Sequence, residues 1–227
     1  MATTSVKKYA YGKTKAQLRR QTSQVIEGLS TEYPEAECAL DHETPAQLLF
    51  ATILSAQCTD VMVNKVTKTL FQKWPDPESL AKARVSEIEK VVKPTGFYKN
   101  KAKNLKACAT ALVKEHRGEV PRELEALTAL AGVGRKTANV VRGNAFGIPG
   151  MVVDTHVKRI CNLIGLTEES DPVKIEYELM EIVRKEDWTM FSHWIIHHGR
   201  AICIARRPKC TECVIRRLCD YGKKQID

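Results

Sequence analysis

The chain has 227 residues, which is enough for one domain or two small ones with a buried core. Hydrophobic residues make up 43% and charged residues 28%, a globular composition that excludes a collagen-like or intrinsically disordered chain. The formal net charge of +9 comes from the two ends, because residues 1–26 contribute +6, residues 200–227 contribute +5, and the stretch between them sums to −2.

Nearly every periodic segment of the sequence indicates a helix, and no run alternates apolar and polar residues as a strand would. Pro- and Gly-containing breakers separate these segments, for example at Trp74–Pro77 and Gly147–Gly150. The pattern therefore predicts an all-α fold. We expect helices at residues 13–29, 45–55, 59–71, 78–92, 101–115, 122–130, 136–146, 154–164, 171–185 and 188–198.

The N-terminal segment is basic, and it lacks the apolar core of a secretory signal. Its six Lys or Arg, its Ser and Thr and its lack of acids fit a transit peptide or a basic arm, of which we favour the arm. No apolar run approaches the roughly 20 residues that span a bilayer. We therefore expect a cytoplasmic protein without membrane contact or organellar targeting. If the two basic ends meet, they form a surface that attracts a polyanion; two solvated tails are the alternative.

Four of the eight cysteines lie within 17 residues, in the pattern Cys203-x6-Cys210-x2-Cys213-x5-Cys219. Four thiolates at short spacing favour a zinc ion or an iron–sulfur cluster, because soft sulfur ligands select these centres. Two local disulfides are the alternative, which the absence of secretory features disfavours. Structural zinc sites favour two Cys-x2–4-Cys pairs joined by a spacer, and the uneven six-two-five spacing fits that pattern poorly.

Basic residues lie inside the cysteine pattern. A metal centre there would brace a basic loop that contains Arg206, Arg207 and Lys209, which we expect to contact nucleic acid. The remaining cysteines stand alone and are interpreted as small buried hydrophobic residues: Cys38, Cys58, Cys108 and Cys161.

A glycine-containing turn joins two predicted helices within Leu130–Ala138. Gly132 and Gly134 allow left-handed backbone and a close approach by a partner. Their amides, followed by a new helix N-terminus near Lys136, form an anion site suited to a phosphate. An ordinary tight turn between helices explains this segment equally well when it is taken alone. A Walker loop is excluded, because the Gly-x4-Gly-Lys spacing is missing.

Lys136 and Asp154 are the candidate catalytic residues. A cation in the first turn of a helix opposes the helix dipole, so this position favours the neutral, nucleophilic form of the Lys136 amine. Asp154 follows an apolar stretch and opens a predicted helix, where an acid is most often an N-cap. A second task for its carboxylate is to activate the amine or water and to stabilise positive charge at a departing glycosidic bond.

Three motifs together resemble the helix-hairpin-helix DNA glycosylases of the endonuclease III type: Leu130–Ala138, Val152–His156 and the four-cysteine tail. The similarity extends over most of the chain and includes Leu54–Asp60, Gly96–Tyr98, Gly118–Pro121 and His198–Arg200. This resemblance implies a bilobal all-α fold, with a hairpin-containing domain at residues 38–148 and a cluster domain from residues 1–37 plus 149–227. It also implies that the four tail cysteines bind a 4Fe–4S cluster and that the protein is a monomer of bacterial type associated with the nucleoid.

The resemblance assigns roles to individual residues. Lys136 would be the nucleophile that attacks the sugar C1′, and Asp154 its catalytic partner. Gln57 would fill the gap left by a flipped nucleotide, and Phe97 would insert between bases where the family usually has a leucine. The hairpin residues implied to contact DNA are Gly132, Val133, Gly134, Arg135 and Thr137.

The implied function is a bifunctional DNA glycosylase and AP lyase of base excision repair. It would bind duplex DNA with an oxidised pyrimidine or an abasic site, excise the base and nick the strand by β-elimination. Adenine-removing relatives share the cluster but lack a lysine at position 136. A non-catalytic DNA-binding protein with a redox-sensing cluster would not need the pair of Lys136 and Asp154. A zinc-stabilised nucleic-acid-binding module is the third alternative, which metal analysis distinguishes.

Overall fold

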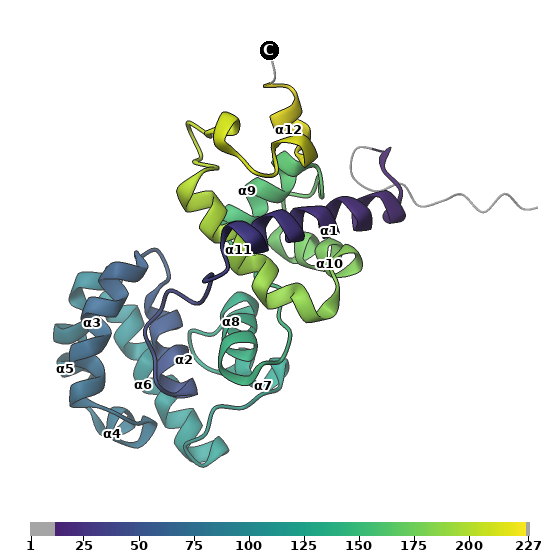
Figure 1. Ribbon diagram of the computed structural model, residues 1–227. Helices are drawn as coiled ribbons and strands as arrows, with labels where there is room; N and C mark the ends of the chain where they lie inside the picture. Colours follow the sequence, from purple (N-terminus) through teal and green to yellow (C-terminus); the bar gives the residue numbers. More distant parts are fainter. Residues whose placement is uncertain (1–11, 226–227) are drawn as a thin grey trace, which may run out of the picture. The chain divides into compact units, whose positions relative to one another are not determined.

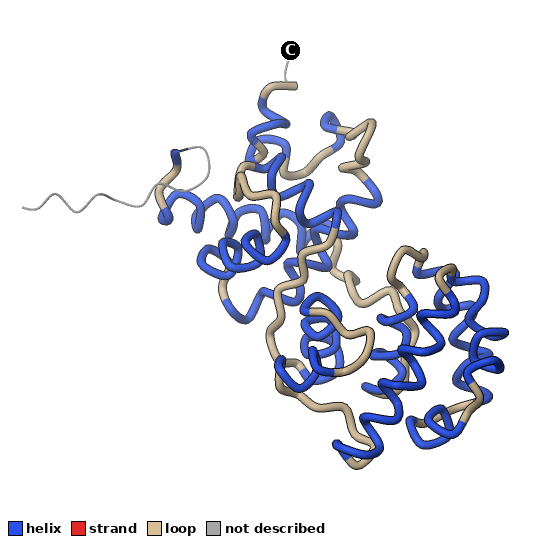
Figure 2. The backbone as a smooth tube through the Cα atoms, turned by 180° about the vertical axis from the view of Figure 1, so that it is seen from behind, coloured by secondary structure: helices blue, strands red, loops and turns tan. Residues whose placement is uncertain are grey.

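The computed structural model describes residues 12–225, and this part of the chain consists of helices, turns and loops without any strand (Figure 2). The all-α prediction is therefore confirmed. Within the described residues, no helix combines the length and the apolar character needed to cross a bilayer. Lys7 and Lys8, which contribute to the basic N-terminal segment, lie outside the described residues.

The chain divides into two compact units, one formed by Cys38–Ile148 and the other by Met1–Glu37 together with Pro149–Asp227. We refer to them as the hairpin unit and the cysteine unit, after the segments that each contains. The hairpin unit comprises α2 (Pro45–Leu54), α3 (Asp60–Lys73), α4 (Pro77–Lys82), α5 (Val85–Val92), η2 (Lys93–Thr95), α6 (Tyr98–His116), α7 (Leu124–Ala129) and α8 (Arg135–Phe146) (Figure 1).

Helix α2 is the centre of the hairpin unit. It begins with Pro45, and the Thr44 side chain caps it by accepting a hydrogen bond from the Gln47 amide. Every residue from Leu48 to Leu54 is buried, so the helix is apolar on all sides and is surrounded by its neighbours. Among these neighbours are α3, α6 and α8.

The sequence predicted one helix at residues 78–92, but the structure has two. Ala83 adopts an extended conformation between α4 and α5, and Arg84, the N-cap of α5, donates hydrogen bonds from its backbone amide and its guanidinium to the Glu87 carboxylate. Leu80 and Ile88 are both fully buried. At about 100° per residue, a continuous helix would turn these two side chains about 80° apart. The break lets both short helices pack against α6.

The cysteine unit comprises α1 (Lys15–Glu32), α9 (Thr155–Ile164), α10 (Pro172–Ile182), η3 (Lys185–Asp187), α11 (Trp188–Ala201), η4 (Cys210–Glu212), η5 (Arg216–Leu218) and α12 (Asp220–Lys223). Its core lies between α1, α9, α10 and α11, with Phe191 as its largest fully buried side chain.

Segments from the two ends of the chain meet within the cysteine unit. The Gln21 amide donates hydrogen bonds to the carbonyl oxygens of Ile164 (3.0 Å) and Leu218 (2.7 Å). The Lys13 ammonium pairs with the Asp220 carboxylate at 2.5 Å, and Lys15 pairs with Glu181 at 3.1 Å. These two basic residues of the N-terminal segment therefore bind acids of their own unit.

Candidate functional site

The turn between α7 and α8 is anchored to the core of the hairpin unit by apolar side chains. Leu127, Leu130 and Val133 are buried, whereas Gly132 and Gly134 are exposed. Gly132 has a φ of +78°, and a Cβ at this position would lie 2.9 Å from the Cβ of Asn104 on α6. Only glycine satisfies both the left-handed backbone and this close approach.

Helix α8 begins directly after the turn, with Gly134 as its N-cap. Because glycine has no side chain, the cap offers no oxygen of its own to the amides of the first turn. These amides, together with the positive end of the helix dipole, suit an external anion. Arg135 and Thr137 are half-buried on either side of Lys136, which is exposed.

Gln57 and Phe97 share an unusual backbone conformation. Gln57 has a φ of +52° and Phe97 a φ of +48°, a left-handed region that residues with a side chain seldom adopt. Gln57 follows α2, and Phe97 is the N-cap of α6. Both side chains are exposed, and Phe97 retains 65% of its accessible surface. The exposed aromatic side chain in a strained turn is therefore a candidate for contact with a partner.

Asp154 lies in the cysteine unit, at the start of α9. Its Oδ1 accepts a hydrogen bond of 2.8 Å from the Val157 amide, so the structure confirms the N-cap interpretation. The preceding residues Met151, Val152 and Val153 are buried and hold the carboxylate at a fixed place in the unit. The cap uses one carboxylate oxygen, and the side chain is only half-buried.

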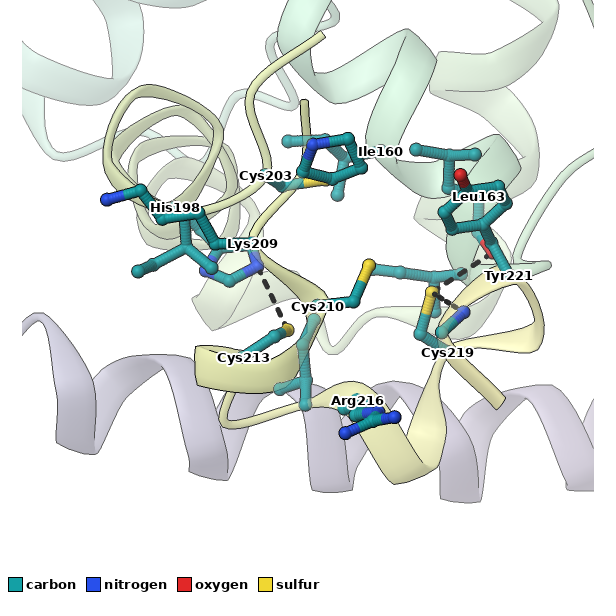
Figure 3. A pocket seen from close by; sticks show the side chains of 15 residues that line it. Ile160, Leu163, His198, Cys203, Lys209, Cys210, Cys213, Arg216, Cys219 and Tyr221 are labelled. Atoms are coloured by element: carbon teal, nitrogen blue, oxygen red, sulfur yellow. Dashed lines mark hydrogen bonds between the residues drawn. The ribbon is translucent and has the colours of Figure 1, made fainter. Parts of the chain in front are cut away.

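The four tail cysteines line one pocket of the cysteine unit (Figure 3). The pocket contains about 370 Å³ of space not filled by atoms, part of it open to solvent. Apolar side chains such as Ile160 and Ile215 form part of its wall. Within residues 12–225, no three Cys, His, Asp or Glu side chains converge closely enough to hold a single metal ion. Four sulfur donors distributed around a pocket fit a multi-atom cluster better than one zinc ion.

Several groups contact the sulfur atoms. The Gly222 amide donates to Cys219 Sγ at 3.3 Å, and the Arg159 guanidinium donates to Cys203 Sγ at 3.5 Å and to the Cys203 carbonyl at 2.6 Å. Burial raises the pKa of Cys213 to about 11 and also raises the pKa of Cys219. These thiols are therefore poorly ionised unless a bound cation offsets the cost of desolvation.

His198 connects the pocket with α1. Its Nε2 lies 3.5 Å from Cys213 Sγ, and its Nδ1 lies 3.1 Å from the Tyr33 hydroxyl. Burial lowers the pKa of His198 to about 4, so the ring is neutral near pH 7. The sequence did not assign Arg159 or His198 to the cysteine pocket. The segment His198–Arg200 was noted only as part of the similarity to the family.

The basic residues between the first two cysteines are exposed, as the loop prediction required: Arg206, Arg207 and Lys209. Lys209 Nζ lies 4.0 Å from Glu212 Oε2, and an exposed ion pair at this distance contributes little to stability. The structure thus groups the predicted residues by unit. The hairpin unit carries Gln57, Phe97 and the Gly132–Thr137 segment, and the cysteine unit carries Asp154, the cysteines and the basic loop.

Comparisons with known proteins extend over most of the chain. A family model described as HhH-GPD superfamily base excision DNA repair protein matches residues 50–185. Endonuclease III of Synechocystis sp. is 51% identical over 205 residues, which cover 90% of this chain and 94% of that protein. A non-covalent endonuclease III–DNA complex is similar with a TM-score of 0.87 and 41% identity, covering 92% of this chain and 98% of that one. A trapped endonuclease III–DNA covalent intermediate has a TM-score of 0.87 and 40% identity, with coverage of 92% and 99%.

Proposed function

The chain belongs to the HhH-GPD superfamily of base excision DNA repair proteins, and from this premise we propose that it excises oxidised pyrimidines from duplex DNA and nicks the abasic strand. The resemblance noted in the sequence is confirmed at the level of the family. Chains similar to this one over nine-tenths of its length have been solved as endonuclease III on DNA and as a covalent intermediate with DNA. DNA glycosylase and AP lyase activity is the function that follows.

The observation that carries the assignment is the exposed Lys136 at the second position of α8. It directly follows the Gly132–Gly134 turn, whose amides suit a phosphate. A nucleophilic amine beside a phosphate site suits attack on the sugar that is attached to that phosphate. This step distinguishes a glycosylase with lyase activity from a protein that only binds DNA.

The proposed reaction uses the Lys136 amine as its nucleophile. Nζ attacks C1′, the bond from C1′ to the base breaks, and the electron pair leaves with the base, which takes up a proton. Loss of a proton from the nitrogen and opening of the sugar ring give an imine between Nζ and C1′. Removal of a C2′ proton then breaks the C3′–O bond, and the phosphate leaves. We assign Asp154 as the carboxylate that stabilises the positive charge at C1′.

Gln57 and Phe97 are proposed to replace the nucleotide that leaves the helix. Their exposed side chains stand on left-handed backbone in the same unit. An apolar wedge between bases unstacks them, and extrusion costs least where damage has already weakened stacking. The damaged base is thereby favoured before any chemistry occurs. We propose oxidised pyrimidines as the substrate class, on the basis of the family resemblance.

We further propose that the four tail cysteines hold a 4Fe–4S cluster. Support comes from four sulfur donors around one pocket, from hydrogen bonds to two of the sulfurs and from a spacing that fits poorly with paired structural zinc sites. When bound, the cluster supplies cross-links between segments that have little apolar contact of their own. The exposed Arg206, Arg207 and Lys209 would then be held in place for the DNA backbone.

Reduction by borohydride tests the nucleophile, because it converts the imine to a stable amine. Incubation with abasic-site duplex DNA and borohydride should give a covalent complex with the unchanged protein. In Lys136→Gln the complex should disappear, since an amide is not nucleophilic, while binding to the same DNA persists.

Lys99→Gln is the matched control, because Lys99 is also exposed and also occupies the second position of a helix in the hairpin unit. This variant loses the same charge and should still be trapped at saturating protein. Undiminished trapping of Lys136→Gln, or equal loss in both variants, would refute the assignment of the nucleophile.

A further inference from the structure

A buried ammonium group lies in the hairpin unit, outside the proposed reaction. The Lys101 side chain on α6 retains only 5% of its accessible surface. Its Nζ donates hydrogen bonds to the carbonyl oxygens of Leu54 (2.8 Å) and Thr95 (2.7 Å). Lysine is almost never buried to this extent without a partner, and here two backbone carbonyls serve as partners.

The two carbonyls belong to the bases of two different loops. Leu54 is the last residue of α2, three residues before Gln57. Thr95 is the last residue of η2, two residues before Phe97. A single amine therefore connects the backbone segments that lead into the two exposed, left-handed residues.

The electrostatic setting shows why a cation suits this place. The last carbonyls of a helix have no partner within the helix and form the negative end of its dipole, and Leu54 supplies one of these carbonyls. Burial lowers the pKa of Lys101, and attraction to Cys58 opposes this effect. The two short hydrogen bonds that the ammonium donates thus offset the cost of desolvating it.

We propose that Lys101 is a positioning residue that couples the Gln57 loop to the Phe97 loop, so that both side chains enter the duplex in a fixed relation. This inference rests on the proposed function of the two loops. Lys101 itself is buried and does not touch the substrate; it acts through the backbone. Loss of the amine releases both loops at once and leaves two buried carbonyls without their donor.

The coupling matters only when a nucleotide is extruded from a base-paired duplex and its place has to be filled. Excision from a duplex needs both loops, because the gap and the unstacked neighbour are filled together. Covalent trapping on a single-stranded abasic oligonucleotide needs no extrusion from a base-paired stack. The ratio of the duplex excision rate to the single-strand trapping rate therefore isolates the work of the loops from the chemistry of Lys136.

The test compares Lys101→Met with Lys106→Met. Lys106 lies on the same helix and donates to the Ala83 carbonyl at 2.7 Å, so it is also a lysine that binds the backbone, but away from both loops. Single-turnover excision is measured on a duplex with an oxidised pyrimidine, and trapping on the single strand. We expect Lys101→Met to lower the ratio about ten- to a hundredfold, the range that a misplacement of about 1 Å produces, and Lys106→Met to leave it unchanged.

Rates are expressed per molecule that can be trapped on the single strand, so unfolded protein does not enter the ratio. Lys101→Gln retains two N–H donors on a shorter side chain and should restore part of the loss. A double-mutant cycle adds a second readout. The effects of Gln57→Ala and Phe97→Ala on the duplex excision rate should be non-additive with Lys101 present and additive in Lys101→Met.

Equal ratios in Lys101→Met and Lys106→Met would overturn the coupling while leaving the proposed function intact. Failure of the proposed function looks different, because the unchanged protein and Lys106→Met would then neither excise the base nor become trapped. A ratio that falls equally in both variants would show a general effect of α6 and would also contradict the inference.

Discussion

The turn between α7 and α8, which precedes the exposed Lys136, and the loop from Cys203 to Cys219, which exposes basic residues of its own, are held in different ways. In the turn, Leu130 and Val133 reach into the core of the hairpin unit. In the 17-residue cysteine loop, only Ile215 and Cys219 are buried. Ordering a residue costs about 1–2 kcal/mol of backbone entropy, which two buried side chains do not offset over such a length. The turn thus folds with its core, whereas the loop needs further cross-links, which the proposed cluster would supply.

Loss of a tail cysteine should have the largest effect on the protein, and the structural change should be confined to the cysteine unit. If the tail cysteines hold the proposed cluster, Cys213→Ser should lose it together with its brown colour, because one of four sulfur donors is replaced by a weaker ligand. Arg206 and Lys209 should then become rapid trypsin sites, since the loop loses its cross-links. Visible absorbance, iron analysis and mass mapping of limited digests measure these changes.

Cys38→Ser is the control, because Cys38 lies in the hairpin unit and outside the pocket. It should keep both the colour and the resistance to trypsin. A colourless unchanged protein that is fully loaded with zinc would contradict the cluster assignment. A digest that cuts the turn between α7 and α8 as fast as the cysteine loop would contradict the difference between the two regions.

A core truncation beneath the turn should give the next largest effect. Leu127 is fully buried in the hairpin unit, so Leu127→Ala should lower the free energy of unfolding by about 2–5 kcal/mol. The iron content of the protein should not change, because the cysteine unit has a core of its own. Urea denaturation followed by circular dichroism measures the loss.

Val61→Ala serves as the surface control for that truncation. Val61 retains 81% of its accessible surface, and its truncation should change the free energy of unfolding by less than about 0.5 kcal/mol. If Leu127→Ala were as mild as this control, the turn would not depend on the core beneath it.

The two glycines of the turn allow a finer test within one segment. Gly132→Ala should cost about 1–3 kcal/mol, because alanine resists a φ of +78° and its Cβ would press against Asn104. Gly134→Ala should cost less than about 1 kcal/mol, since Gly134 has an ordinary φ of −90° and no atom lies within 4 Å of the added Cβ. Thermal unfolding compares the two variants. Equal losses would show that the left-handed backbone is not the source of the strain.

The sequence predicted the all-α class and most of the helices because apolar periodicity and capping residues act locally. Pro45 marks the predicted start of α2, and the structure confirms that start, with Thr44 as the N-cap. The break at Ala83 was not predicted, because residues 78–92 contain no Pro or Gly and the break depends on packing against α6.

The predicted site was incomplete for a related reason. Lys101 resembles any lysine on a solvent-facing helix, and its acceptor at Leu54 lies 47 positions away in the chain. His198 likewise meets Tyr33 across 165 positions. Such partners come together only in the folded protein. The roles of Lys136, Asp154, Gln57 and Phe97 remain predictions, because local motifs supplied them and only experiment tests their chemistry.

The smallest expected change in stability concerns Asp154, where two substitutions separate its role as an N-cap from the proposed role of its charge. Asp154→Ala removes the oxygen that accepts the Val157 amide and should cost about 1 kcal/mol of stability. Asp154→Asn keeps an equivalent oxygen and should be nearly as stable as the unchanged protein, because Asn is as good an N-cap as Asp. If the carboxylate stabilises charge at C1′, both variants should lose base excision to a similar extent. Urea denaturation and single-turnover excision then separate the two roles, and full activity of Asp154→Asn would leave the residue with its cap alone.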